Sequence, residues 1–174
     1  MDFGKTNHNE MDMDVIYDWN ELRRSGPVIG GKFELVDESL RDGLQSPSVR
    51  NPSIEEKLEL LHLMEACGIE NADVGLPGTG EQAAVDVRRL CAEIRDQNMK
   101  IKPNCAGRTH PADVQAIISA SQDVGRAIEV CAFLGASPIR RVLEGWDLER
   151  MVKMTVDSAR MAVDAGLPFS FVTE

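Results

Sequence analysis

Positive charge is scarce in this 174-residue sequence. Lys and Arg number 19 against 29 Asp and Glu, which gives a formal net charge of −10. Nucleic acids and anionic membrane surfaces are bound through clusters of positive charge. The composition therefore argues against nucleic acid and against a membrane as partners. An anionic ligand would have to meet a local group of basic side chains.

Long apolar runs are also missing. No stretch approaches the ~18 consecutive apolar residues of a membrane-spanning helix. The first residues, MDFGKTNHNEMDMD, lack the apolar core of a secretory signal. The four cysteines form no C-x-x-C pair, so they do not indicate a zinc site. We expect them to be small buried side chains in a reducing compartment, with the cytoplasm as the location.

Three common ligand-binding and catalytic motifs do not occur. The sequence has neither a G-x-x-x-x-G-K-[ST] phosphate loop nor a G-x-S-x-G nucleophile turn. Gly75, Gly78 and Gly80 follow an apolar run, but their spacing differs from the G-x-G-x-x-G of dinucleotide-binding folds. We therefore interpret this glycine cluster as a turn.

Apolar runs with strand character alternate with helical patterns from residue 33 onward. Strands are expected to begin near residues 33, 69, 101, 127 and 169. Helices are expected over residues 53–67, 80–94, 110–122 and 147–165. This alternation predicts right-handed crossovers and an α/β fold with a parallel sheet. Two folds have this order: a doubly wound open sheet, and a (β/α)8 barrel truncated after strand five.

A cluster of polar residues follows the first expected strand. Residues 37–45 read Asp-Glu-Ser-Leu-Arg-Asp-Gly-Leu-Gln, and the carboxyl ends of barrel strands form the ligand-binding face. Asp42 offers a hard oxygen ligand for a divalent metal, and Arg41 can hold a carboxylate or a developing oxyanion. A surface ion pair of little functional value is the alternative interpretation of these two residues.

The run Asp37-x-x-Leu40-Arg41-Asp42-Gly43-x-Gln45 resembles the signature of the DRE-TIM metallolyase family. That family includes 2-isopropylmalate synthase, homocitrate synthase, citramalate synthase and hydroxymethylglutaryl-CoA lyase. Residues 73–77 are similar to its E-x-G-[FY]-P motif, with Asp73 where Glu is usual. The resemblance implies a TIM barrel. Residues 1–31 would be an irregular N-terminal lead-in, and residues 32–174 the first half of a TIM-barrel catalytic domain.

The resemblance also implies roles for the polar residues at the first two strand ends. Asp42 would bind a divalent metal, which could be Mg²⁺, Mn²⁺ or Zn²⁺. Arg41 would act in catalysis by polarising the keto oxygen of a 2-oxoacid or by stabilising an enolate. Gln45 would line the same pocket. Asp73 would bind substrate there and support Arg41 or the metal.

Three further residues match later motif positions of the family. Arg108 follows the third expected strand, where the family often carries an Arg near the substrate carboxylate. An exposed loop Arg is the alternative interpretation. Ser137 matches the Ser after the fourth strand, and Glu174 matches the catalytic Glu of the fifth. The resemblance therefore implies that Arg108 and Ser137 bind substrate and that Glu174 is catalytic.

The metal site of the family is incomplete in this sequence. The family completes it with a His-x-His on the seventh strand, whereas this sequence holds only His8, His62 and His110. One carboxylate does not hold a divalent ion tightly. A five-stranded half-barrel would also leave its first and fifth strands as open edges. We therefore expect a fragment of a longer protein, or a homo-oligomer that covers the exposed core.

The function implied by the resemblance is a metal-dependent, Claisen-type condensation. It would join an acyl-CoA, with acetyl-CoA as the co-substrate, to a 2-oxoacid, as 2-isopropylmalate synthase does. The 174-residue piece is expected to be inactive by itself. One alternative is carbon–carbon bond cleavage like that of hydroxymethylglutaryl-CoA lyase. The other alternative is a non-catalytic half-barrel that acts as an assembly subunit.

Overall fold

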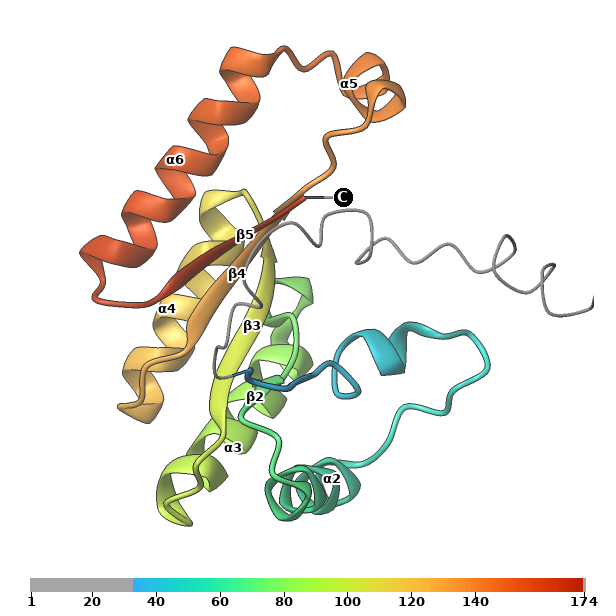
Figure 1. The fold of residues 1–174 in the computed structure, drawn as a ribbon, viewed down its shortest axis with the longest axis vertical. Coiled ribbons are helices and arrows are strands. Elements are labelled where there is room, and N and C mark those ends of the chain that lie inside the picture. Colours follow the sequence, from blue (N-terminus) through green and yellow to red (C-terminus); the bar gives the residue numbers. More distant parts are fainter. Residues whose placement is uncertain (1–32, 174) are drawn as a thin grey trace, which may run out of the picture. The chain divides into compact units, whose positions relative to one another are not determined.

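The computed structural model describes residues 33–173, in which five strands form one parallel sheet (Figure 1). The strands are β1 (Val36–Asp37), β2 (Asn71–Asp73), β3 (Lys102–Arg108), β4 (Glu129–Leu134) and β5 (Phe169–Thr173). Their order in the sheet is the same as their order in the sequence. A doubly wound sheet reverses its order at a switch point, so the sequential order identifies half of a (β/α)8 barrel.

Helices connect the successive strands, as the sequence predicts. The α-helices are α2 (Ile54–Cys67), α3 (Glu81–Asp96), α4 (Pro111–Val124), α5 (Pro138–Glu144) and α6 (Leu148–Asp164). Two short 3-10 turns, η2 (Asp42–Gln45) and η3 (Pro77–Thr79), follow β1 and β2. The second of these turns lies in the cluster of Gly75, Gly78 and Gly80, where the sequence predicts a turn. Among residues 33–173, no helix combines the length and apolar character needed to cross a bilayer.

Local sequence explains where the helices begin and end. The Ser53 hydroxyl accepts the N–H of Glu56 at 3.3 Å, and the Glu56 carboxylate accepts the N–H of Ser53 at 2.7 Å. This reciprocal pair satisfies N–H groups that the first turn of α2 leaves free. Gly68 ends the helix with φ of 81°, a left-handed conformation that glycine adopts without steric cost. The Asp147 carboxylate caps α6 in the same way as Ser53, accepting the N–H of Arg150 at 2.7 Å.

The two faces of the sheet differ because alternate residues of a strand point to opposite sides. On β4, Val130 and Ala132 are buried under the helices, whereas Glu129 and Cys131 line the opposite, concave face. The buried strand residues join one apolar core with helix residues that include Leu61, Leu90, Ile94 and Ile117. Among residues 33–173, the helices and the core therefore cover one face of the sheet, and no helix covers the other face.

Pro103 lies inside β3, which has a strand on each side. A proline has no N–H to give to a sheet, so it is rare in a central strand. Here Lys102 donates its backbone N–H to the carbonyl of Glu70, just before β2, at 2.8 Å. Because the backbone groups of consecutive strand residues point to opposite sides of the strand, the nitrogen of Pro103 faces β4. The pairing of β3 with β4 begins only at Asn104. The missing N–H therefore falls where no partner strand is yet present.

Two expectations from the sequence need correction. The helix α5 was not predicted, although Ser137 and Pro138 form a suitable start. Seven residues are too few to show a helical period, which explains the omission. The expectation of four buried cysteines is wrong for Cys67, which is exposed at the end of α2. It is right for Cys91 and Cys105, while Cys131 is partly exposed.

Candidate functional site

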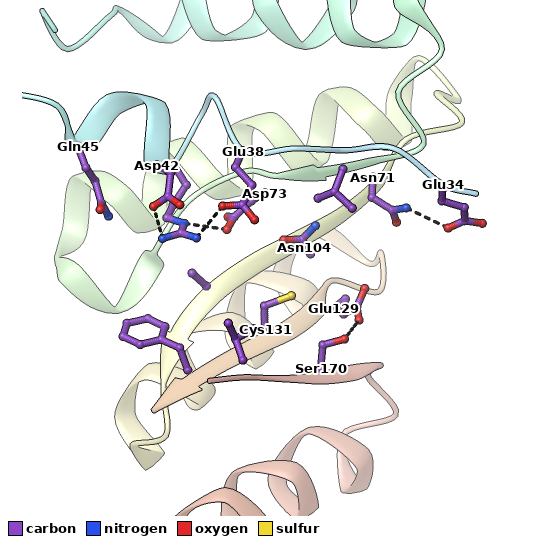
Figure 2. Close-up of a pocket in the computed structure, with 15 residues that line it drawn as sticks. Glu34, Glu38, Asp42, Gln45, Asn71, Asp73, Asn104, Glu129, Cys131 and Ser170 are labelled. Carbon is purple, nitrogen blue, oxygen red and sulfur yellow. Dashed lines mark hydrogen bonds and ion pairs between the residues drawn. The ribbon is translucent and has the colours of Figure 1, made fainter. Parts of the chain in front are cut away.

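A cavity of about 640 Å³ opens on the concave face of the sheet (Figure 2). Its mouth is formed by four residues that follow β1, namely Glu38, Arg41, Asp42 and Gln45. Inward-facing strand residues form its floor, among them Asn71, Asp73, Asn104, Glu129, Cys131 and Ser170. The cavity thus brings together four of the residues singled out from the sequence: Arg41, Asp42, Gln45 and Asp73.

Arg41 is held by three carboxylates at the mouth of the cavity. Its Nε donates to Asp73 at 2.9 Å, and a terminal nitrogen donates to Glu38 at 3.0 Å. The other terminal nitrogen is paired with Asp42. Burial by itself would lower the pKa of the guanidinium, but the three carboxylates raise the pKa above its ordinary value. A cation of fixed orientation therefore lies at the carboxyl end of β1.

Asp73 occupies the end of β2 with a side chain that is only 3 % exposed. One oxygen accepts the N–H of Gly75 at 3.1 Å, and the other accepts Arg41. Burial raises the pKa of this carboxyl, while the Gly75 N–H and the Arg41 guanidinium act in the opposite direction. The short side chain thus reaches Arg41, although the resemblance places Glu at this position.

Glu38 and Asp42 are two neighbouring carboxyl groups at the mouth. A hydrogen bond with Asp42 and partial burial raise the pKa of Glu38, whereas Arg41 lowers it. Repulsion from a neighbouring carboxylate favours the protonated form of Glu38. Glu38 can therefore keep its proton to a higher pH than an isolated carboxyl can.

The other site residues predicted from the sequence lie elsewhere. Arg108 is at the end of β3 but does not line the cavity, and its guanidinium binds both oxygens of Asp113 at 2.8 Å each. Ser137 is exposed and caps α5, where its hydroxyl accepts the N–H of Arg140 at 3.2 Å. Glu174 lies outside the described residues. The roles of these three residues stay predictions.

The polar residues of the cavity floor were not predicted from the sequence. Asn71 donates from its amide to Glu34 at 2.9 Å, and the Ser170 hydroxyl donates to the Glu129 carboxylate. Asn104 lies between them on β3. A signal was available, because these polar residues occupy alternate positions in strands whose other positions are apolar or small.

Cys131 also lines the floor but is unsuited to act as a nucleophile. Burial is the main cause that raises the pKa of its thiol, to about 12. The thiolate, which is the reactive form, is therefore a minor species at neutral pH. The reactive groups among the lining residues are carboxyls and the Arg41 guanidinium.

The described residues do not make a complete metal site. Within residues 33–173, no three His, Cys, Asp or Glu side chains are grouped so that they could hold an ion. Asp42 presents a half-exposed carboxylate at the mouth, with one oxygen paired to Arg41. Both oxygens of Asp73 are already used by Arg41 and Gly75. Structural and catalytic metal sites need three or more protein or substrate ligands. Residues 33–173 supply one candidate ligand, Asp42, and the others would have to come from elsewhere.

Comparison with known proteins identifies relatives among synthases. Homocitrate synthase AksA of Methanopyrus kandleri is 29 % identical over 141 residues, which cover 80 % of this chain and 33 % of the relative. A 2-isopropylmalate synthase of Streptococcus gallolyticus is 30 % identical over 110 residues, which cover 63 % of this chain and 20 % of the relative. The chain thus spans a third or less of the length of these two relatives.

A model of the HMGL-like family matches residues 32–174. This match includes the mouth of the cavity, the strands of its floor and the four helical crossovers between them. It covers most of the chain, and the half-barrel agrees with the barrel that the resemblance implied. The chain therefore belongs to the HMGL-like family of DRE-TIM metallolyases.

Proposed function

We propose that the protein that carries this chain joins an acyl-CoA to a 2-oxoacid in a Claisen-type condensation, with acetyl-CoA as the first candidate donor. The observation that carries this proposal is the Arg41 guanidinium, fixed by Asp73, Glu38 and Asp42 at the mouth of the cavity. The acyl-CoA and the 2-oxoacid are its proposed partners.

The arrangement of Arg41 suits the charge that this reaction develops. When an enolate carbon attacks a keto carbon, negative charge grows on the keto oxygen. The contacts to the three carboxylates use three of the five N–H donors of a guanidinium. The remaining donors can bind that oxygen, and donors fixed before the reaction stabilise a developing oxyanion most strongly. Asp73 would act as a positioning residue for Arg41.

A divalent metal is part of the proposal. When bound, it would supply Lewis acidity to the 2-oxoacid carbonyl. Asp42 would contribute one ligand, and further ligands would come from residues outside 33–173 or from the substrate. This chain's own residues bind and orient the keto oxygen through Arg41, and Glu38, whose pKa is raised, can hold a proton beside it.

The names of the relatives support condensation over cleavage, because both are synthases. A lyase-like cleavage of a hydroxyacyl-CoA uses similar groups in the reverse direction. A non-catalytic assembly role would leave the Arg41 cluster without a chemical task. These two alternatives are therefore outcomes of the same test.

The condensation product is still a CoA thioester, and hydrolysis of that thioester by water gives the free acid and free CoA thiol. The test is release of this thiol by the native protein, whose intact mass is measured first. The protein is given acetyl-CoA and a series of 2-oxoacids, with and without EDTA. We expect thiol release that needs a 2-oxoacid, stops with EDTA and returns with Mg²⁺, Mn²⁺ or Zn²⁺. A rate of thiol release that is the same with and without EDTA would overturn the metal requirement. Cleavage of a hydroxyacyl-CoA without any condensation would identify a lyase, and no turnover at all would favour the assembly role.

A further inference from the structure

A row of three polar side chains crosses the floor of the cavity below Arg41. Asp73 on β2 is in register with Asn104 on β3, and Asn104 is in register with Glu129 on β4. All three line the cavity. Neighbouring strands lie about 4.8 Å apart, so the three side chains are adjacent on one face. Figure 2 shows Asn104 between the other two.

The two carboxylates that flank Asn104 are already bonded to other groups. Asp73 accepts from Arg41 and from the N–H of Gly75. The Glu129 carboxylate accepts the hydroxyl of Ser170 on the next strand. Both acidic side chains therefore have partners of their own on the side away from Asn104.

Asn104 has no such partner in the part of the chain that the structure describes. The residue is only 5 % exposed. Within residues 33–173 its carboxamide makes no hydrogen bond, although its backbone carbonyl accepts the N–H of Val74. A carboxamide offers two donors and an acceptor. Among the described residues, the Asn104 amide atoms are not both buried from solvent and unpaired, so they face the cavity and are open to water or to a ligand. A ligand group that displaces this water loses affinity unless it replaces the hydrogen bonds of the water, so the amide indicates a polar group of the ligand.

Charge and polarity limit what that group can be. An aliphatic group would leave the amide unpaired when it displaced water from the floor. A second carboxylate would lie between Asp73 and Glu129, and like charges at this distance repel each other. A neutral hydroxyl or carboxamide meets neither penalty, and it can both donate and accept.

We infer that Asn104 is a specificity-determining residue that selects a 2-oxoacid with a neutral hydrogen-bonding group at its distal end. This inference rests on the proposed condensation. It excludes as preferred substrates both a 2-oxoacid with a plain aliphatic end and one with a second carboxylate.

Three 2-oxoacids of equal chain length test the inference on the native protein. They are 2-oxopentanoate, 5-hydroxy-2-oxopentanoate and 2-oxoglutarate, which differ only at C5. Thiol release gives kcat/KM, and calorimetry gives Kd for each. We expect the hydroxyl compound to exceed both others by about tenfold in kcat/KM, the effect of roughly one hydrogen bond.

Variants of Asn104 assign the preference to this residue. Asn104→Ala should bring the hydroxyl compound to within about twofold of 2-oxopentanoate. Asn104→Asp keeps the size of the side chain and can still accept a hydrogen bond, so this variant should still prefer the hydroxyl compound to 2-oxopentanoate. The added negative charge should lower kcat/KM for 2-oxoglutarate further. Asn71→Ala is the matched control. The Asn71 amide lies in the same cavity but already donates to Glu34, so the ratio between the substrates should not change.

The outcomes separate the two proposals. The inference would be overturned if Asn104→Ala left the ratio of the hydroxyl compound to 2-oxopentanoate unchanged, or if Asn104→Asp left the ratio of the hydroxyl compound to 2-oxoglutarate unchanged. A wild-type preference for 2-oxopentanoate or 2-oxoglutarate would overturn it too. In each of these cases the proposed condensation would stand. If the wild-type protein released thiol with other 2-oxoacids but with none of these three, the inference alone would be overturned. Failure to release thiol with any 2-oxoacid of the series would overturn the condensation, and the inference with it.

Discussion

Arg41 is a residue whose geometry matters as well as its charge. Three nitrogens of its planar guanidinium contact Asp73, Glu38 and Asp42 at once. A lysine ammonium has a single nitrogen and cannot make three contacts in these directions. We expect Arg41→Lys to lower kcat/KM for condensation by roughly 10²–10³, the usual cost of losing one fixed oxyanion donor. Steady-state thiol release measures it.

The control for this substitution is Arg50→Lys. Arg50 pairs with Glu56 at 2.6 Å on the surface and does not line the cavity. Such exposed ion pairs contribute little to stability, so kcat/KM of the Arg50→Lys variant should stay within about twofold of wild type. Equal losses in the two variants would show that the Arg41 effect is not specific to the site.

At the scale of elements, Asp113 joins α4 to the end of β3. Its carboxylate accepts the N–H of Arg108 at 3.0 Å and the guanidinium through both oxygens. Burial opposes the charged form, yet these contacts with Arg108 lower the pKa of Asp113 below its ordinary value. Gly78 of η3 also packs here, because an added Cβ would lie 2.8 Å from the Asp113 carboxyl carbon.

Asp113→Asn should reduce the free energy of unfolding by roughly 1–3 kcal/mol at pH 7, since it removes charge-assisted bonds to a buried carboxylate. Because the pKa of Asp113 is lower in the folded protein than in the unfolded chain, its ionised form stabilises the fold at pH values above the unfolded-state pKa. This stabilisation is lost as the pH falls through the folded-state pKa. The difference from wild type should therefore shrink below about pH 4. Urea unfolding at several pH values measures it.

Asp123→Asn on the same helix is the comparison. Asp123 pairs with Arg88 at 2.7 Å, but both side chains are exposed. We expect a loss below about 0.5 kcal/mol with little pH dependence. A loss for Asp113→Asn no larger than this would mean that the contact with Arg108 does not hold α4 to β3.

At the scale of the whole half-barrel, β5 is an edge strand among the described residues. Phe171 is 43 % exposed there, and Val172 lies exposed in the open cavity. Open edges with apolar side chains favour association. We expect the 174-residue chain to self-associate, and Phe171→Lys to weaken this association about tenfold, as measured by sedimentation over a range of concentrations.

Val85→Lys is a suitable control because Val85 is an exposed apolar residue of α3, away from the edge strands. It should leave the association unchanged. A chain that sediments as a monomer at all concentrations would contradict the prediction. Equal effects of the two lysine substitutions would show that association is not specific to β5.

The sequence by itself determined the order of the elements and their helix caps. Alternating apolar runs, Ser53 with Glu56, Gly68 and Asp147 act through neighbouring residues, so they can be recognised without the fold. The nine-residue run around Arg41 was sufficient to place the chain in its family, and it located the mouth of the cavity. These features depend on contacts within a few residues.

Only the tertiary structure decided which barrel face is polar and which residues share the site. The sequential strand order, which excludes a doubly wound sheet, depends on pairing between distant segments. The same pairing sets Asn104 between Asp73 and Glu129 and turns Arg108 toward Asp113, outside the cavity. Register and side-chain direction are properties of several strands together, so no single segment encodes them.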